Sequence, residues 1–216
     1  MDKSNIKKRI KLHFDGERLT ATENGRHAGS WAGVSGKEGL QKPNLQHLGN
    51  EGPIPESVYS VGQLQYPPEK GTWDRLWGRM HHGTWPGLEA AWGNSTAWLK
   101  HKSGENPVFH YRGKDGFSIH GGAEAGSAGC IDLTDQMDSF ADFYRKTGQS
   151  ADLIVSYPNY DPASDPAIQF ILRKQSREQP EMRSPSEENR WEPDPASENR
   201  RPFGGLSLRD ALRIFE

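Results

Sequence analysis

Residues 117–133 read FSIHGGAEAGSAGCIDL, in which a short apolar run ends at a histidine and a loop of small residues leads to a cysteine. The run is typical of a β-strand, which delivers His120 into the glycine-rich loop. A nucleophilic thiol needs a base within hydrogen-bond reach and a lowered pKa, because the thiolate is its reactive form. A flexible loop of this length can place His120 beside Cys130. We therefore interpret this segment as catalytic, with Cys130 as the nucleophile and His120 as the general base.

The residues just before Cys130 suit the binding of a negatively charged oxygen. Gly129 lets backbone and substrate approach closely, since it has no Cβ. The backbone amides from Ser127 to Cys130 are candidates for an oxyanion hole in acyl transfer. A purely structural cysteine is the alternative, but the joint spacing of histidine, serine, glycine and cysteine favours catalysis.

Downstream of Cys130 the pattern changes to that of a helix. Thr134 or Asp135 is the expected N-cap, and apolar residues recur every three to four positions up to Tyr144. Residues 152–157, DLIVSY, then predict a strand that ends before a proline.

The chain upstream predicts mostly strands. Asp15-Gly16 between apolar residues indicates an opening β-hairpin, whereas residues 36–55 are rich in Gly, Pro and Asn and predict a loop. Alternating residues predict further strands at SVYSVGQL (57–64), AWLKH (97–101) and VFHYR (108–112). With the helix after Cys130, these segments predict a mainly β fold of the α+β class.

The C-terminal part differs from the rest in composition. Residues 175–205 are rich in Pro, Glu, Arg, Ser and Asn, which predicts a polar linker or extended arm after a catalytic domain at 1–174. Residues 206–216, LSLRDALRIFE, place Leu208, Leu212 and Phe215 on one face and predict a short amphipathic helix. This helix either docks on the domain, occludes the active site or binds a partner.

Composition narrows the classes of function. Lys and Arg total 27 against 29 Asp and Glu, a net charge of -2, so no basic field favours nucleic acid or anionic lipid. The single cysteine excludes an intrachain disulfide. The first residues lack the apolar centre of a signal peptide, and no run approaches the roughly 18 apolar residues of a membrane span. We therefore expect synthesis in the cytoplasm without membrane insertion.

The pattern His-Gly followed by Ser-x-Gly-Cys resembles the catalytic signature of YkuD-type L,D-transpeptidases. Four further stretches resemble the subgroup delivered as type VI secretion effectors, namely KLHFDGERLTA, SWAGVSG, GPIPE and CIDL. The resemblance covers roughly residues 10–160. It implies a YkuD-like β-sandwich or barrel and a reaction that needs no cofactor.

The resemblance also implies roles for single residues. Ser127 and Gly129 belong to the loop that shapes the nucleophile and the oxyanion site. A backbone carbonyl, that of Gly121 or Gly122, would orient the catalytic histidine. Asp132 stands where the family usually has an arginine that helps to hold the substrate, so we take Asp132 as a candidate for substrate binding.

The implied activity is acylation of the cysteine by a peptidoglycan tetrapeptide stem, at the L-centre of its diamino acid, with loss of D-alanine. Transfer to water is L,D-carboxypeptidase activity, transfer to a free D-amino acid is exchange, and transfer to another stem forms a cross-link. A cell-wall toxin needs only the first two.

The subgroup further implies an antibacterial effector that is secreted and acts in the periplasm of a target cell. Its expected partners are stem peptides, an immunity protein and a secretion carrier. The alternatives are a non-catalytic peptidoglycan-binding module of the same fold and a cytoplasmic cysteine peptidase.

Other residues carry weaker signals. His110 either lines the site or is a half-buried strand residue, and Arg112 either holds a substrate carboxylate or is a solvated surface charge. His81 and His82 would point to opposite faces of a strand without further ligands, so we expect no metal site. The five tryptophans between positions 73 and 98 either form a platform for glycan or peptide or, as we favour, pack against the core.

Overall fold

The opening hairpin sets the direction of the first strands. In the computed structural model, which describes residues 10–67, 85 and 89–178, β1 (Ile10–Phe14) pairs antiparallel with β2 (Arg18–Glu23). Asp15 Oδ1 accepts hydrogen bonds from the amides of Glu17 at 3.0 Å and Arg18 at 2.8 Å, while Gly16 turns the chain with a φ of 104°. The predicted hairpin is confirmed.

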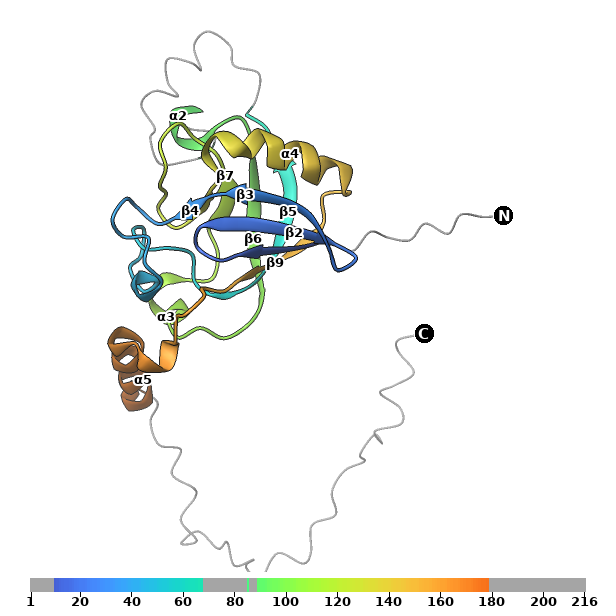
Figure 1. The fold of residues 1–216 in the computed structure, drawn as a ribbon. Helices are drawn as coiled ribbons and strands as arrows, with labels where there is room; N and C mark the ends of the chain where they lie inside the picture. The colour runs from blue at the N-terminus through green and yellow to red at the C-terminus, as the bar shows by residue number, and fades with distance from the viewer. Residues whose placement is uncertain (1–9, 68–84, 86–88, 179–216) are drawn as a thin grey trace, which may run out of the picture. The chain divides into compact units, whose positions relative to one another are not determined.

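The described strands form a single nine-stranded sheet in the order β3-β2-β1-β9-β5-β6-β7-β8-β4 (Figure 1). Beyond the hairpin, its strands are β3 (Arg26–Ala32), β4 (Val34–Ser35), β5 (Ser57–Gln65), β6 (Thr96–Ser103), β7 (Phe117–His120), β8 (Ile131–Asp132) and β9 (Ala151–Val155). Although β3 and β4 stand at opposite ends of this order, only Gly33 separates them along the chain. One extended segment therefore pairs with β2 through its first half and with β8 through its second, which makes the sheet nearly closed.

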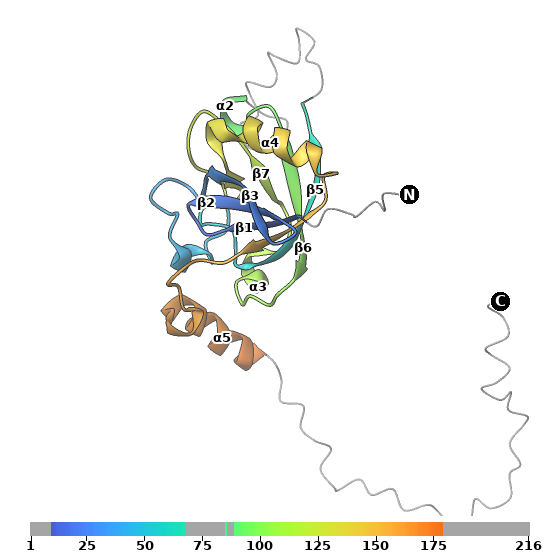
Figure 2. The ribbon, with the colours of Figure 1, turned by 45° about the vertical axis from the view of Figure 1, so that its right-hand side comes forward.

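A helix after the cysteine covers one end of this sheet. It is α4 (Met137–Lys146), which lies across the sheet near β3, β5 and β7 (Figures 1 and 2). Phe140 and Tyr144 lie on the buried face of α4, and the ring centroid of Phe140 is 5.1 Å from that of Trp31 on β3. Tyr144 also donates its hydroxyl hydrogen to the carbonyl of Val61 on β5 at 3.0 Å. The prediction of a mainly β fold with a helix after Cys130 is confirmed.

The remaining described helices are short or peripheral. They are α2 (Glu89–Trp92), α3 (Phe109–Arg112) and α5 (Pro166–Glu178), with 3-10 turns η1 (Pro43–Leu45), η2 (Thr134–Gln136) and η3 (Pro162–Ser164). The predicted cap of α4 at Thr134 or Asp135 is wrong, since α4 begins at Met137 after the η2 turn. The carboxylate of Asp132, just before the turn, accepts a hydrogen bond from the Thr134 amide at 2.8 Å.

The predicted strand at VFHYR is also wrong, because these residues form α3. Asn106 starts the helix, since its carbonyl accepts from the amide of Phe109 at 3.0 Å and its side chain accepts from that of Val108 at 3.2 Å. Val108 and Phe109 are both buried, and two adjacent buried residues are compatible with either a strand or a helix. The local turn at Asn106 and Pro107 decides between the two.

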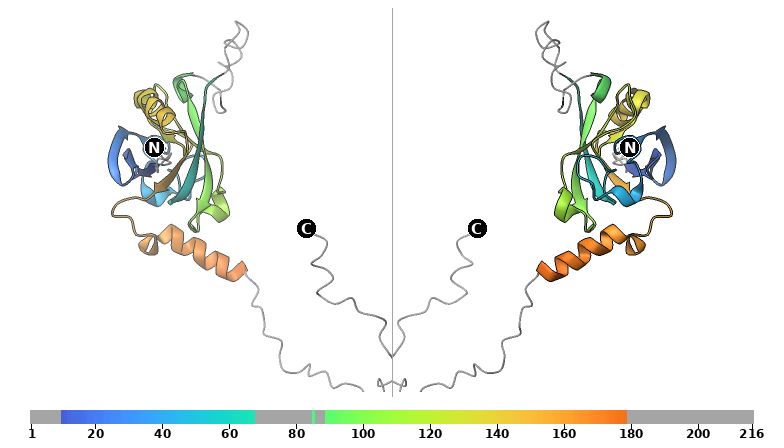
Figure 3. Two further views of the ribbon diagram at one scale, coloured as in Figure 1. Left: turned by 90° about the vertical axis from the view of Figure 1, so that its right-hand side faces the viewer. Right: turned by 90° about the vertical axis from the view of Figure 1, so that its left-hand side faces the viewer.

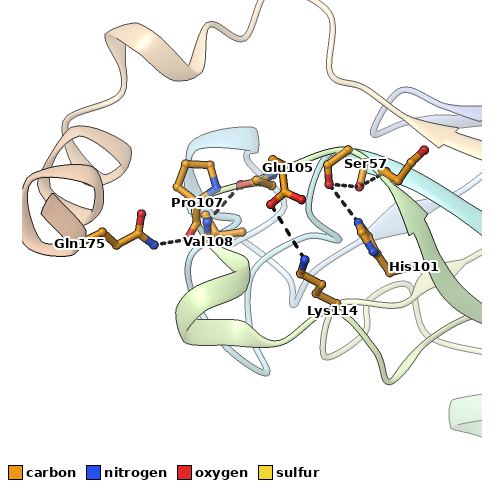
Figure 4. A network of polar contacts seen from close by, with 10 residues as sticks. Ser57, His101, Glu105, Pro107, Val108, Lys114 and Gln175 are labelled. Carbon is orange, nitrogen blue, oxygen red and sulfur yellow. Dashed lines mark hydrogen bonds and ion pairs between the residues drawn. The ribbon is translucent and has the colours of Figure 1, made fainter. Parts of the chain in front are cut away.

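Helix α5 was not predicted, and residues 175–178 of the expected linker are its last residues. Ile168 and Ile171 pack with Val108 in a second, small core, and Gln175 donates to the carbonyl of Pro107 at 3.4 Å (Figure 4). This packing holds α5 outside the sheet, on the side where α3 lies (Figure 3). The rest of the predicted linker and the helix at 206–216 fall outside the described residues.

Closure of the sheet predicts an effect of substitution at Gly33. A Cβ there would lie 2.7 Å from Leu133 Cδ2 and 3.0 Å from the carbonyl oxygen of Asp132, and the Leu133 side chain is itself fully buried. We expect Gly33→Ala to lower the free energy of unfolding by about 1–3 kcal/mol, as overpacking does in other cores. Urea denaturation monitored by tryptophan fluorescence measures this difference.

Gly49→Ala is the matched control, because nothing lies within 4 Å of a Cβ at that position. Its free energy of unfolding should stay within about 0.5 kcal/mol of the unsubstituted chain. Equal stability of the two variants would contradict the close approach of the strands at Gly33.

Candidate active site

Strand β7 places His120 in the interior of the sheet. It lies between β6 and β8, and all four of its residues are buried. β7 runs parallel to β8, with Ile119 opposite Ile131 and His120 opposite Asp132. Because Cys130 directly precedes β8, this pairing brings the cysteine and the histidine to adjacent strands.

The loop between β7 and β8 is held by its own polar groups. Ser127 donates its hydroxyl hydrogen to the carbonyl of Cys130 at 2.5 Å, and the Gly129 amide donates to Ser127 Oγ at 3.3 Å. The Ser127 amide is bonded to the carbonyl of Gly36 at 3.1 Å. The loop therefore reaches Cys130 in a fixed conformation, and Ser127 takes part in that conformation through three hydrogen bonds.

The imidazole of His120 is oriented by a backbone carbonyl. Its Nδ1 lies 2.8 Å from the oxygen of Gly121, one of the two carbonyls expected to orient the ring. A carbonyl oxygen only accepts hydrogen bonds, so we assign the proton to Nδ1, which leaves Nε2 for the sulfur of Cys130. Gly122 lies further along the loop, where a Cβ would be 2.8 Å from the carbonyl of Ala90 in α2.

Cys130 has the electrostatics of an activated thiol. Burial by itself disfavours the thiolate, but a hydrogen bond and the charge of His120 outweigh it and lower the pKa of the Cys130 thiol. The residue is 9% exposed, so the sulfur is shielded without being sealed.

The interaction with Cys130 changes the pKa of His120 in the opposite direction. Burial disfavours the imidazolium, yet the hydrogen bond to Cys130 and the charge of the thiolate raise the pKa of His120 above its ordinary value. A lowered thiol pKa and a raised imidazole pKa both favour a thiolate–imidazolium pair. Such a pair supplies a nucleophile together with a proton for the leaving group.

Asp132 lies beside this pair but faces the chain's own amides. Its fully buried carboxylate accepts from the amides of Gly126 at 3.0 Å and Thr134 at 2.8 Å. Burial raises the pKa of Asp132, against the opposing effects of the His120 charge and of these two hydrogen bonds. The carboxylate thus joins the glycine-rich loop to the start of the η2 turn.

Arg112 is neither on a strand nor a solvated surface charge, in contrast to the prediction. It ends α3 behind the cysteine, where its guanidinium donates to the carbonyls of Gln46 at 2.8 Å, Gly52 at 2.8 Å and Pro53. Burial lowers the pKa of Arg112, although nearby tyrosines and Cys130 oppose this shift. The guanidinium is thus engaged by the chain's own backbone.

An open cleft of about 810 Å³ leads to the sulfur. The described residues that line it are Lys37, Glu38, Asn50, Ala91, Trp92, Gly116, His120, Glu124, Ala125, Gly126, Ser127, Ala128 and Cys130. Trp92 of α2 packs its ring 4.8 Å from that of His120 and forms one wall. Cys130 and His120 thus line the same cleft, which is large enough to admit a peptide.

The other predicted residues lie apart from this lining. His110 is exposed on α3, in ring contact with Tyr111, so the strand expected for it is wrong. Trp85 and Trp98 flank Trp92 with ring centroids 5.8 and 6.1 Å away, whereas Trp73, Trp77, His81 and His82 lie outside the described residues. Within the described ranges, no three metal-binding side chains gather, and no helix has the length and apolarity to cross a bilayer.

Trp92 was predicted only as one of five tryptophans, for which core packing was favoured over a substrate platform, whereas it lines the cleft. Ser118, which helps to lower the pKa of the Cys130 thiol, was missed in the sequence. Ser118 was readable, because residues two apart on a strand share a face and it precedes His120 by two.

No protein-family model and no curated protein matches the sequence. Among solved structures, the fold is similar to Bd1075 of Bdellovibrio bacteriovorus, with a TM-score of 0.44 and 16% identity over 82% of this chain and 58% of that one. It is similar to L,D-transpeptidase 1 of Mycobacterium tuberculosis, with a TM-score of 0.36 and 13% identity over 69% of this chain and 63% of that one.

A third similar structure is an L,D-transpeptidase of Xylanimonas cellulosilytica, with a TM-score of 0.36 and 13% identity over 72% of this chain and 63% of that one. The chain spans less than two thirds of each of these three solved chains. Likenesses at these TM-scores support no functional assignment.

The paired charges predict that His120 controls the reactivity of the thiol. His120→Gln removes the imidazolium, so we expect the pKa of Cys130 to rise by about 1–3 pH units, the usual effect of losing a close opposite charge. Alkylation by iodoacetamide as a function of pH measures this pKa, and the single cysteine makes the reaction site-specific.

His27→Gln is the control, because His27 is an exposed residue of β3. The pKa of the Cys130 thiol in this variant should equal that in the unsubstituted chain. An unsubstituted thiol that reacts only at the pH of an ordinary cysteine would show that the pair is not formed.

Proposed function

We propose that this chain is a cysteine-dependent peptidoglycan-modifying enzyme, acting on tetrapeptide stems as an L,D-carboxypeptidase, by D-amino-acid exchange, or both. The observation that carries this proposal is the placement of Cys130 and His120 together by the β7–β8 pairing, with both residues lining one open cleft. The lowered pKa of the Cys130 thiol and the raised pKa of His120 support it. The motif resemblance adds the substrate, since it is to enzymes that open the bond before the terminal D-alanine.

Acylation would begin with attack of the Cys130 thiolate on the carbonyl carbon at the L-centre of the diamino acid. As the tetrahedral intermediate collapses, the C–N bond to D-alanine breaks and the imidazolium of His120 gives its proton to the departing amine. The products are a thioester on Cys130, free D-alanine and a neutral imidazole. The hydrogen bond to Gly121 keeps Nδ1 protonated, so Nε2 is the atom that gives the proton.

Deacylation would use the same groups in reverse. Nε2 of His120 takes a proton from water or from the amine of a D-amino acid as it attacks the thioester carbonyl. The C–S bond then breaks, which regenerates the thiolate–imidazolium pair. Water yields a tripeptide stem, and a D-amino acid yields a tetrapeptide with a new terminal residue.

The charges along the cleft suit a substrate of this kind. Lys37, Glu38 and Glu124 line it, and Lys37 also forms an ion pair with Glu51 at 3.3 Å. A stem peptide carries free carboxylates and, on its diamino acid, an ammonium group. Both signs of charge therefore meet a complementary side chain in the cleft, which favours orientation over strong binding.

The reaction is tested by incubation of the purified chain with tetrapeptide muropeptides, with and without D-methionine, followed by mass spectrometry. We expect loss of one alanine from the stem, or its replacement by methionine, because both follow from one thioester. The Cys130→Ala variant is the control and should leave the muropeptides unchanged. Unchanged muropeptides with the unsubstituted chain, despite a reactive thiol, would exclude this substrate.

We also propose that the enzyme is an antibacterial effector delivered by a type VI secretion system into the periplasm of a target cell. This proposal rests on the resemblance of the segments around positions 10–56 and 130–133 to that effector subgroup. An immunity protein would protect the producer by covering the cleft, and a secretion carrier would deliver the chain.

Expression in a susceptible bacterium tests this second proposal. We expect growth arrest when the chain is fused to a periplasmic signal peptide and normal growth when it stays in the cytoplasm, because the substrate lies outside the inner membrane. Cys130→Ala in the periplasm should be harmless. Equal toxicity of that variant would favour a binding module, and toxicity from the cytoplasm would favour a peptidase of internal substrates.

A further inference from the structure

Ser118 lies on the strand that carries the histidine and is fully buried. Successive side chains of a strand point to opposite faces, so Ser118 and His120 point to the same face of β7. Ser118 pairs with Trp98 on one side, and the β7–β8 pairing places Cys130 on the other. The serine thus lies inside the sheet, between the strand of Trp98 and the residue that we propose as the nucleophile.

The hydroxyl of Ser118 is buried and has no hydrogen-bond partner among the described residues. Burying a hydroxyl in this way costs free energy that an alanine at the same position would not cost. The sulfur of Cys130 lies 4.0 Å from the carbonyl oxygen of Gly116, which is a weak contact.

The strand register places the serine opposite the cysteine. Ile119 pairs with Ile131, so the preceding residues, Ser118 and Cys130, lie opposite each other at the start of the β7–β8 pairing. Hydrogen bonds from the side chain and the backbone of Ser118 also act to lower the pKa of the Cys130 thiol. A hydrogen bond to a charged acceptor is stronger than one between neutral groups, so a thiolate is the acceptor that suits this hydroxyl best.

We propose that Ser118 is a further catalytic residue, whose hydroxyl and amide together hold the sulfur of Cys130 in its anionic form. This inference rests on the proposed function in one respect, that Cys130 is the nucleophile. Ser118 would act in both half-reactions, acylation and deacylation. Ser118 stabilises the thiolate that attacks the stem peptide, and it stabilises the same thiolate when the thioester bond breaks.

Other charged groups lie around the site and must be held constant in a test. From the strands and helices around it, and from the cleft, they are His120, Asp132, Arg112, Lys37, Glu38 and Glu124. None of them is altered by a substitution at Ser118, which carries no charge.

The test is the pH dependence of iodoacetamide alkylation of Ser118→Ala. We expect the titration of the thiol to move up by about one pH unit, the size expected for one lost hydrogen bond to a charged group. Below that titration the alkylation rate should fall about tenfold, since each pH unit changes the thiolate population tenfold.

Stability separates this role from a structural one. At a pH where the thiol is protonated, the hydroxyl has no partner to lose, so Ser118→Ala should unfold at a urea concentration equal to or higher than that of the unsubstituted chain, whereas loss of a structural hydrogen bond would lower it. Ser118→Thr retains the hydroxyl and should restore the titration. Ser95→Ala is the matched control, because Ser95 is the other described serine whose buried hydroxyl lacks a partner.

The outcomes distinguish this inference from the function on which it rests. If the pKa of the Cys130 thiol is lowered in the unsubstituted chain and equally lowered in Ser118→Ala, the role of Ser118 is overturned and the proposed function is not. A rise of this pKa in Ser95→Ala as large as that in Ser118→Ala would have the same meaning. An unsubstituted thiol with the titration of an ordinary cysteine would overturn the activated pair, and with it the proposed function.

Discussion

The parallel pairing of β7 with β8 is the constraint on which the site depends. Neighbouring strands lie about 4.7–4.9 Å apart, so this pairing fixes the separation of the residues at their ends. Parallel strands usually need a crossover of a dozen or more residues with a helix, but here residues 121–130 suffice. The loop can be short because its glycines and alanines cross the strand ends closely. The histidine and the cysteine meet as a result of sheet geometry.

Four ionisable groups are brought together around this pairing in a largely buried site. Burial disfavours the charged form of each, and the structure offsets this in different ways. Cys130 and His120 offset it through each other, Asp132 through two backbone amides, and Arg112 through backbone carbonyls. Because Asp132 and Arg112 use the backbone, their charges act on the pair without forming ion pairs that would neutralise it. The thiolate therefore keeps His120 as its direct counter-ion.

Sequence patterns predicted the parts of the fold that depend on local alternation. The opening hairpin, β5, β6, β7 and α4 could be predicted because their apolar periods match the faces that become buried. At residues 108–112 the apolar residues fit a strand or a helical turn equally, and Asn106 decided between them. For the site, the spacing from His120 to Cys130 carried enough information. The role of Arg112 could not be predicted from the sequence. Its hydrogen-bond acceptors lie 59 to 66 residues away and are backbone carbonyls, which any residue type supplies.

The glycine of the Ser-x-Gly-Cys pattern shows how the site and the fold share residues. Gly129 has a φ of 115°, and a Cβ there would lie 1.9 Å from Nη2 of Arg112. A side chain at this position would therefore displace the guanidinium that holds Gly52 and Pro53 behind the cysteine. On its other side the same loop forms part of the cleft. The pattern thus needs glycine for the packing behind the sulfur as much as for the approach of a substrate in front of it.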